Sequence, residues 1–381
     1  MRAARGRGAI AAGAAVLVFS GARAGDFADG VVAYAPAPGQ FVNNAQFNQP
    51  SRALGPPGVA GGTLAPDNSK AVTLGGFGGS IVLRFSEPVL DDPCNPFGLD
   101  AVVYGNGFYV GGAAGRRWAE AGIVEISRDA NGNGVADDPW FVIRGSHLPE
   151  SPASVLESQR WDLNAATPDP PANLGWYPAG APASFVTTTF GLPALFDTFV
   201  LENPNGVGAA LEGVWGYADC SPTLVLGDLN GDNVVDTPGM SAGAFYTSPD
   251  NPRAAGVTPG SGGGDAFDIR WARDPETGAA AGLASFDFVR ISTGANFLAA
   301  VLGEVSTEVS AVADVRPREA FFDRTGDGAA DVEDLYRWQS LRMSGDSSAD
   351  LDGDGVTNEA DRAMMMRCVR RNETSDAGTA R

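Results

Sequence analysis

The chain has 381 residues, enough for about two domains, and 44% of them are hydrophobic, enough to form a core. Its 51 glycines and 26 prolines, with only 19% charged residues, favour β structure with many turns over helical bundles. The formal net charge of −20 disfavours nucleic acid and anionic lipid as partners and favours cations, while the single histidine, His147, excludes a multi-histidine zinc or iron site.

The N-terminus has the three parts of an export signal in order. Arg2, Arg5 and Arg7 precede a short apolar run at residues 9–19, and an A-x-A cleavage site at residues 22–24 follows, before Gly25. The run is too short to span a bilayer comfortably, although an uncleaved anchor or a buried helix is the alternative. The sequence therefore predicts a signal peptide at residues 1–24 and a secreted, extracellular or envelope protein without a transmembrane anchor after cleavage.

Export would place the three cysteines in an oxidising compartment. Cys94 and Cys220 both lie in the main body and are the natural candidates for one disulfide, whereas Cys368 lies far downstream. The alternative is that all three are free and buried, where they would behave as small hydrophobic residues. An odd number of cysteines leaves at least one unpaired or joined to another molecule.

Six short runs rich in valine, isoleucine, phenylalanine and tyrosine, each bounded by turn residues, predict β-strands. They lie at residues 80–85, 100–104, 122–127, 140–143, 196–201 and 286–291. Few helical periodicities interrupt them, which favours an antiparallel β-sandwich of the jelly-roll kind over residues 25–315. The stretch at residues 237–264, rich in glycine, proline and serine, predicts a long surface loop within this body.

A smaller unit follows a boundary at residues 316–317. Apolar residues at helical spacing predict two helices there, each without a clear helix before it. The first set is Val332, Leu335, Trp338 and Leu341, and the second is Ala360, Met364, Met365, Cys368 and Val369. The predicted fold is therefore a mainly β body followed by a small α-helical domain at residues 316–371, with a disordered tail at residues 372–381.

Each predicted helix follows a twelve-residue segment that fits the calcium loop of an EF-hand. Oxygen-bearing side chains stand at positions 1, 3, 5, 9 and 12, a glycine at position 6 allows the sharp turn, and position 7 offers its carbonyl. The predicted calcium ligands of loop one are Asp323, Thr325, Asp327, Ala329, Asp331 and Asp334. Those of loop two are Asp350, Asp352, Asp354, Val356, Asn358 and Asp361. The alternative is a pair of Asp-Gly turns on an acidic surface.

Both loops end in aspartate, where an EF-hand usually has glutamate, and each is followed by a helix. In these features residues 318–371 resemble a type I dockerin, a duplicated loop–helix module in which aspartate at position 12 is usual. The resemblance implies calcium-dependent folding and docking onto a cohesin-like protein. Recognition in that family relies largely on positions 10 and 11 of each loop, which here are residues 332–333 and 359–360.

Two loops in the body begin in the same way but lack the closing carboxylate at position 12. The first offers Asp129, Asn131, Asn133 and Asp137 as candidate calcium ligands, and the second offers Asp228, Asn230, Asp232 and Asp236. A calcium site in either loop would have to take an oxygen from elsewhere. The alternative for each is an Asx-rich hairpin turn, because Asn-Gly pairs are strong turn formers.

Several segments of the body carry a second resemblance. They lie at residues 74–89, 100–110, 118–146, 216–233, 265–278, 286–293 and 302–315. Together they resemble a family of secreted or surface-exposed bacterial proteins of unknown activity, of the kind found in planctomycetes and Bacteroides. The resemblance implies a jelly-roll-like fold and an exported location, but it implies no reaction.

The sequence thus predicts an exported calcium-binding protein with a docking module and a non-catalytic binding or adhesion body. The alternative is a glycoside hydrolase, or an accessory subunit for polysaccharide degradation, which would need two carboxylates flanking one bond. Candidate acids, which no spacing singles out, are Glu120, Glu125, Asp219 and Asp268. Trp161 and Trp176 lie in polar, proline-rich surroundings and are the better candidates for stacking on a glycan.

Overall fold

The protein is described from a computed structural model. The described residues are 26–57 without 38 and 40, 68–109 without 77 and 78, 116–118, 120, 122–143, 154–159, 187–192, 200–202, 218–219, 264–293, 298–299, 303–304, 306–352 and 355–379. Several predictions fall outside them: the signal peptide, the loop predicted at residues 237–264 except its last residue, Gly264, and the side chains of His147, Trp161, Trp176 and Cys220.

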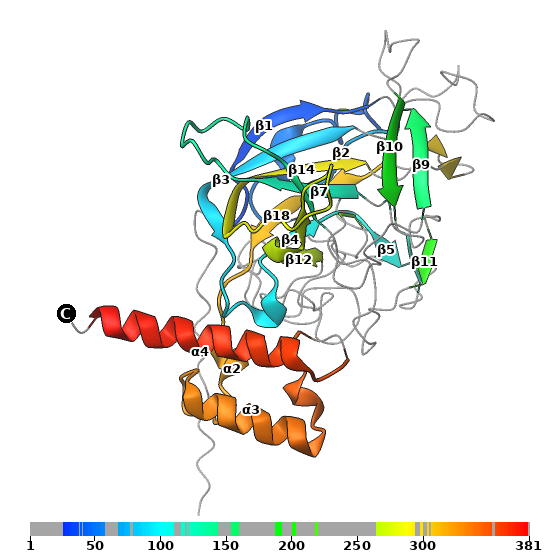
Figure 1. The fold of residues 1–381 in the computed structure, drawn as a ribbon. Coiled ribbons are helices and arrows are strands. Elements are labelled where there is room, and N and C mark those ends of the chain that lie inside the picture. Colours follow the sequence, from blue (N-terminus) through cyan, green and yellow to red (C-terminus); the bar gives the residue numbers. More distant parts are fainter. Residues whose placement is uncertain are drawn as a thin grey trace, which may run out of the picture.

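The largest sheet of the described body has six strands, all antiparallel to their neighbours (Figure 1). In spatial order they are β1 (Gly30–Ala35), β3 (Ser80–Leu90), β14 (Ser285–Thr293), β7 (Gly122–Ser127), β8 (Phe141–Ile143) and β13 (Ala272–Arg273). The runs predicted at residues 80–85, 122–127 and 286–291 form β3, β7 and β14, the centre of this sheet. Their β-branched and aromatic side chains suit a pleated surface that is buried on at least one face.

Smaller antiparallel sheets complete the described body. One joins β12 (Asp265–Phe267), β4 (Ala101–Tyr104) and β18 (Ala311–Asp314), and another joins β11 (Val200–Glu202), β6 (Arg116–Trp118) and β5 (Phe108–Tyr109). The two-stranded pairs are β9 (Ser154–Gln159) with β10 (Thr187–Leu192), β15 (Leu298–Ala299) with β16 (Gly303–Glu304), and β17 (Glu308–Val309) with β2 (Val72–Thr73). Short 3-10 turns are η1 (Pro50–Ala53), η2 (Pro96–Gly98) and η5 (Ile269–Trp271). The body is therefore rich in antiparallel β structure, as the sequence predicts.

Strand β4 connects two apolar clusters. Successive side chains of a strand point to opposite faces, so Val103 packs in the main cluster with Ile126 and Val289 of the large sheet. Val102 and Tyr104 pack instead in a second cluster. All four residues of β4 are buried, which explains why its sequence is continuously apolar rather than alternating.

The C-terminal part consists of α2 (Glu319–Phe322), α3 (Val332–Ser344), the 3-10 turn η6 (Ser347–Ala349) and α4 (Glu359–Thr379). In Figure 1, α4 lies between α3 and the sheets. A short helical turn precedes each acidic loop, although the sequence shows no clear helix there. Helix α4 continues through residues 372–379, where the sequence predicts a disordered tail. Just before this segment, Arg371 pairs with Asp92 at 3.1 Å, and at its first residue Asn372 donates to the Ala330 carbonyl at 3.1 Å.

A disulfide joins the body to α4, and it corrects the predicted Cys94–Cys220 pair: Cys94 bonds to Cys368. Both cysteines are fully buried, in a cluster with Phe322, Trp338 and Met365. Close to this bridge, the rings of Phe97 and Phe321 lie 4.8 Å apart in an edge-to-face arrangement. The C-terminal helices therefore share part of their core with the body.

None of the helices in the described part of the chain combines the length and the apolar character needed to cross a membrane.

Candidate metal sites

Asp334, at position 12, holds loop one together. Its Oδ1 accepts hydrogen bonds from the backbone N–H groups of Arg324 (2.6 Å) and Thr325 (2.9 Å), and its Oδ2 accepts from that of Asp331 (2.8 Å). Asp331 in turn caps α3 by accepting from Glu333 N at 2.7 Å. The buried Asp334 carboxylate thus fixes both the fold of the loop and the start of the helix.

Loop two repeats this arrangement position by position. Asp361 Oδ1 accepts from the backbone N–H groups of Leu351 (2.6 Å) and Asp352 (3.2 Å), and Asp361 Oδ2 accepts from that of Asn358 (2.6 Å). Asn358 Oδ1 then accepts from Ala360 N at 2.6 Å, in the first turn of α4. Two segments of different sequence therefore adopt the same closed loop, centred on the position-12 carboxylate.

The position-1 aspartates make a second shared contact. Asp323 Oδ2 accepts from Gly328 N, and Asp350 Oδ2 accepts from Gly355 N, both at 2.8 Å. Gly328 and Gly355, at position 6, have φ angles of 96° and 86°, a conformation that favours glycine. The hydrogen bond from Gly328 is the largest influence lowering the pKa of Asp323 below its ordinary value, so this group stays ionised at neutral pH.

The acids of loop two converge more closely than those of loop one. Carboxylate oxygens of Asp350, Asp352 and Asp361 all lie within 4.8 Å of one another, while Asp354 lies outside the described residues. Within the described chain, the acids of loop one form no comparable group of three. Thr325 stands at position 3 there, and its hydroxyl donates to Asp323 Oδ1 at 3.3 Å. Asp327 instead accepts from the position-7 N–H of Ala329 at 3.0 Å.

Trp338 on α3 packs the two loop–helix repeats together. Its side chain is fully buried, and its indole N–H donates to the carbonyl of Ala349 at 2.7 Å, one residue before loop two. Leu351 from loop two and Met365 from α4 belong to the same cluster. The helical spacing that predicted α3 and α4 is thus the spacing of residues facing a common core.

The body loop at residues 129–138 shares much of this geometry. Asp129 Oδ2 accepts from Gly134 N at 2.7 Å, the same contact between positions 1 and 6, and Asn133 Oδ1 accepts from Val135 N at 2.7 Å. Asn131 and Asn133 each donate to Asp137, at 3.2 and 3.1 Å. Asp138 Oδ2 accepts from the position-2 N–H of Ala130 at 3.0 Å, a contact that position 12 makes in the C-terminal loops.

Asp138 is therefore the residue that the sequence reasoning missed in this loop. The sequence carries a sign of it, since an acid at position 10 can accept from the backbone at position 2, although the calcium-loop pattern places the closing acid at position 12. The second candidate loop in the body, with Asp228, Asn230, Asp232 and Asp236, lies outside the described residues.

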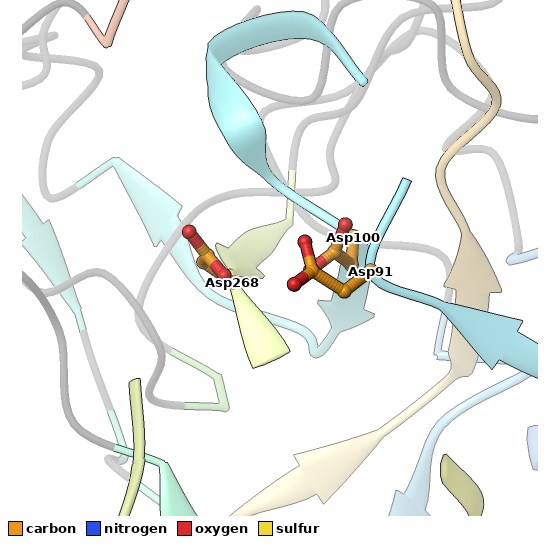
Figure 2. A group of neighbouring side chains, drawn as sticks. All are labelled: Asp91, Asp100 and Asp268. Carbon is orange, nitrogen blue, oxygen red and sulfur yellow. The ribbon is translucent and has the colours of Figure 1, made fainter. Parts of the chain in front are cut away.

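A different acidic cluster lies where the body meets α4 (Figure 2). Asp91 and Asp100 lie side by side with Asp268 opposite, and oxygens of the three lie within 4.8 Å of one another. Arg270 compensates much of this charge through a bidentate ion pair with Asp268 and a 4.0 Å approach to Asp91. Arg367 of α4 adds a second positive charge close to these acids. The cluster thus has the composition of a structural ion-pair network between the body and α4.

The four candidate acids of the hydrolase alternative have different surroundings. Asp268 pairs with Arg270, and Glu125 forms two 2.6 Å hydrogen bonds with Arg290 on the neighbouring strand. Glu120 and Asp219 do come together, but both are buried, at 6% and 0% exposure. A pair of acids open to a sugar chain is therefore not found among these four.

No protein-family model matches the chain, and no curated protein matches it significantly in sequence.

Proposed function

We propose that the protein is an exported calcium-binding protein whose two C-terminal loops each hold one calcium ion and whose helices depend on those ions. The observation that carries the proposal is the repeated hydrogen-bond pattern of Asp334 and Asp361. On each of these side chains Oδ1 accepts two backbone hydrogen bonds and Oδ2 accepts one, so Oδ2 keeps a lone-pair position for a metal bond. Calcium accepts six to eight oxygen ligands from carboxylates, amides and backbone carbonyls, the donors that both loops offer.

A role in protein docking rests on the resemblance to dockerins and on the surface of α3. Val332, at position 10 of loop one, is 44% exposed, and Tyr336 and Met343 are 72% and 80% exposed. Their spacing places them on one side of the helix. Exposed aromatic and methionine side chains are enriched where proteins bind one another, which supports α3 as the docking face for a cohesin-like partner.

For the body, we propose a jelly-roll-like β-sandwich that acts in binding or adhesion without catalysis. The sharing of one apolar cluster by the six-stranded sheet and the sheet of β4 supports a layered arrangement. The buried disulfide supports export, because such bonds persist in oxidising compartments. A glycan is the ligand class that the tryptophan-rich sequence suggests.

Calcium titration of the full-length protein tests the first part of the proposal. The double variant D334N/D361N should bind two calcium ions fewer per chain than the wild type. The matched control is E333Q, which changes an exposed acid of the same loop at position 11 and should bind as the wild type does. Equal calcium binding by D334N/D361N and the wild type would contradict the proposal.

Docking needs its own experiment. The wild type should be captured by an immobilised type I cohesin in calcium but not in EGTA, and Y336S should be captured much less. Failure of capture would contradict the docking role while leaving calcium binding intact.

A further inference from the structure

Three acidic side chains from distant parts of the sequence meet inside the body. Oxygens of Glu120, Asp219 and Glu308 all lie within 4.8 Å of one another. The three residues are only 6%, 0% and 1% exposed. Carboxylates buried this close together repel one another strongly unless a cation or protons offset their charge.

The backbone around the cluster holds these side chains in place. Asp219 Oδ1 accepts from Asn106 N at 2.7 Å, and its Oδ2 accepts from Glu308 N at 3.0 Å. The backbone of Asp219 has a φ of 59°, which is uncommon for a residue with a side chain, and its carbonyl accepts from Glu120 N at 3.0 Å. A side chain at Gly105 would overlap the Asp219 carboxylate. Several chain segments therefore position the three carboxylates together.

One oxygen of the cluster has no donor. Glu308 Oε1 is buried and makes no hydrogen bond within the described part of the chain. Among the described lysines and arginines, none forms an ion pair with Asp219 or Glu308, whereas Arg270 pairs with Asp268 in the cluster of Figure 2. A buried acceptor left unsatisfied destabilises the folded state, more so when it is charged, so an unsatisfied carboxylate oxygen points to a missing partner.

The electrostatic environment agrees with this geometry. Burial first, and then the neighbouring Glu120, raise the pKa of Glu308 well above its ordinary value in the absence of a bound cation. The same two causes raise the pKa of Asp219. A small cation bound between the three side chains would therefore stabilise this site most.

We propose that a divalent cation binds between Glu120, Asp219 and Glu308, with Glu308 Oε1 as one of its ligands. The donor set consists of oxygen alone, which selects calcium or magnesium over zinc or copper. Two hydroxyls, Thr73 Oγ1 and Ser306 Oγ, lie 2.5 Å apart next to this cluster, since Thr73 faces Glu308 in the β2–β17 pair. Calcium is the better fit, because it tolerates irregular geometry and needs fewer retained waters than magnesium. The ion would be structural and would hold together the three chain segments that carry these acids.

Metal analysis of the full-length protein tests this site separately from the C-terminal loops. After dialysis against calcium and removal of free metal, E308Q should carry one calcium ion fewer per chain than the wild type. The control D314N removes a half-buried acid of the body outside the cluster and should keep the wild-type content. D334N/D361N should lose the loop ions but keep this one, so failure at one place is distinguishable from failure at the other.

Hydrogen exchange on the wild type covers the case in which E308Q does not fold. Calcium should slow exchange in the peptide that spans β17 and β18, both in the wild type and in D334N/D361N, and magnesium at the same concentration should slow it less. Unchanged exchange in both proteins would overturn the proposal. So would an E308Q protein that keeps the full metal content; if it is also more stable than the wild type at pH 7, protons rather than a cation offset the charge.

Discussion

Removal of the Cys94–Cys368 disulfide by the double substitution C94A/C368A should strongly destabilise the protein. The bridge spans 274 residues of sequence. In the chain-entropy relation, a cross-link of this length raises the free energy of the unfolded state by about 5–6 kcal/mol at 25 °C, because it removes conformational entropy. Measured losses commonly fall below this relation, so we expect the free energy of unfolding to decrease by about 3–5 kcal/mol. Because both sulfurs lie in the core of the C-terminal helices, the loss should be largest there.

Urea titration followed by circular dichroism and tryptophan fluorescence measures this change. The control is C220A, which should retain the bridge and its stability, and peptide mapping without reductant should still recover a cross-linked pair containing residues 94 and 368. The reasoning is refuted if C94A/C368A unfolds at the wild-type urea concentration. It is also refuted if mapping of the wild type recovers a bridge to Cys220.

Other consequences concern single side chains. Burial raises the pKa of Asp314 from 3.8 to about 7, so the folded state holds this proton more tightly than the unfolded state does. The free energy of unfolding should therefore fall as pH rises from about 4 to 7. Thermal melts across this range should show a flatter pH dependence for D314N. W338F should lower the free energy of unfolding by about 2 kcal/mol in denaturant titrations, because it leaves the Ala349 carbonyl buried without a donor. G355A should weaken calcium binding to loop two in direct titrations, since the φ of 86° is strained for alanine; unaltered affinity would argue against the loop geometry.

Local patterns predicted the elements whose residues interact with near neighbours in sequence. Alternation and turn residues located β3, β7 and β14, and the spacing of Leu335, Trp338 and Leu341 located α3. The acidic loops were located because their hydrogen bonds connect residues no more than 10 positions apart. Such contacts leave a readable spacing in the sequence.

Long-range contacts left no comparable pattern. Cys94 reaches Cys368 only after the body and the C-terminal helices have packed, so proximity in sequence favoured the wrong partner, Cys220. Nothing in the sequence around Glu308 distinguishes it from a solvent-exposed acid. It is buried where the neighbouring Ser306 and Thr307 hydrogen-bond to Glu120, 186 and 187 residues away from them. Arg371 of α4 likewise pairs with Asp92 of the body, a contact between residues 279 positions apart.

Hydrogen–deuterium exchange of the full-length protein in calcium and in EGTA tests the central claim most directly. The account predicts that chelation accelerates exchange in the peptides of α3 and of the first half of α4 in the wild type. In D334N/D361N, exchange should be fast under both conditions. Equal protection of these helices in calcium and in EGTA would show that the loops order them without an ion, and would contradict the account.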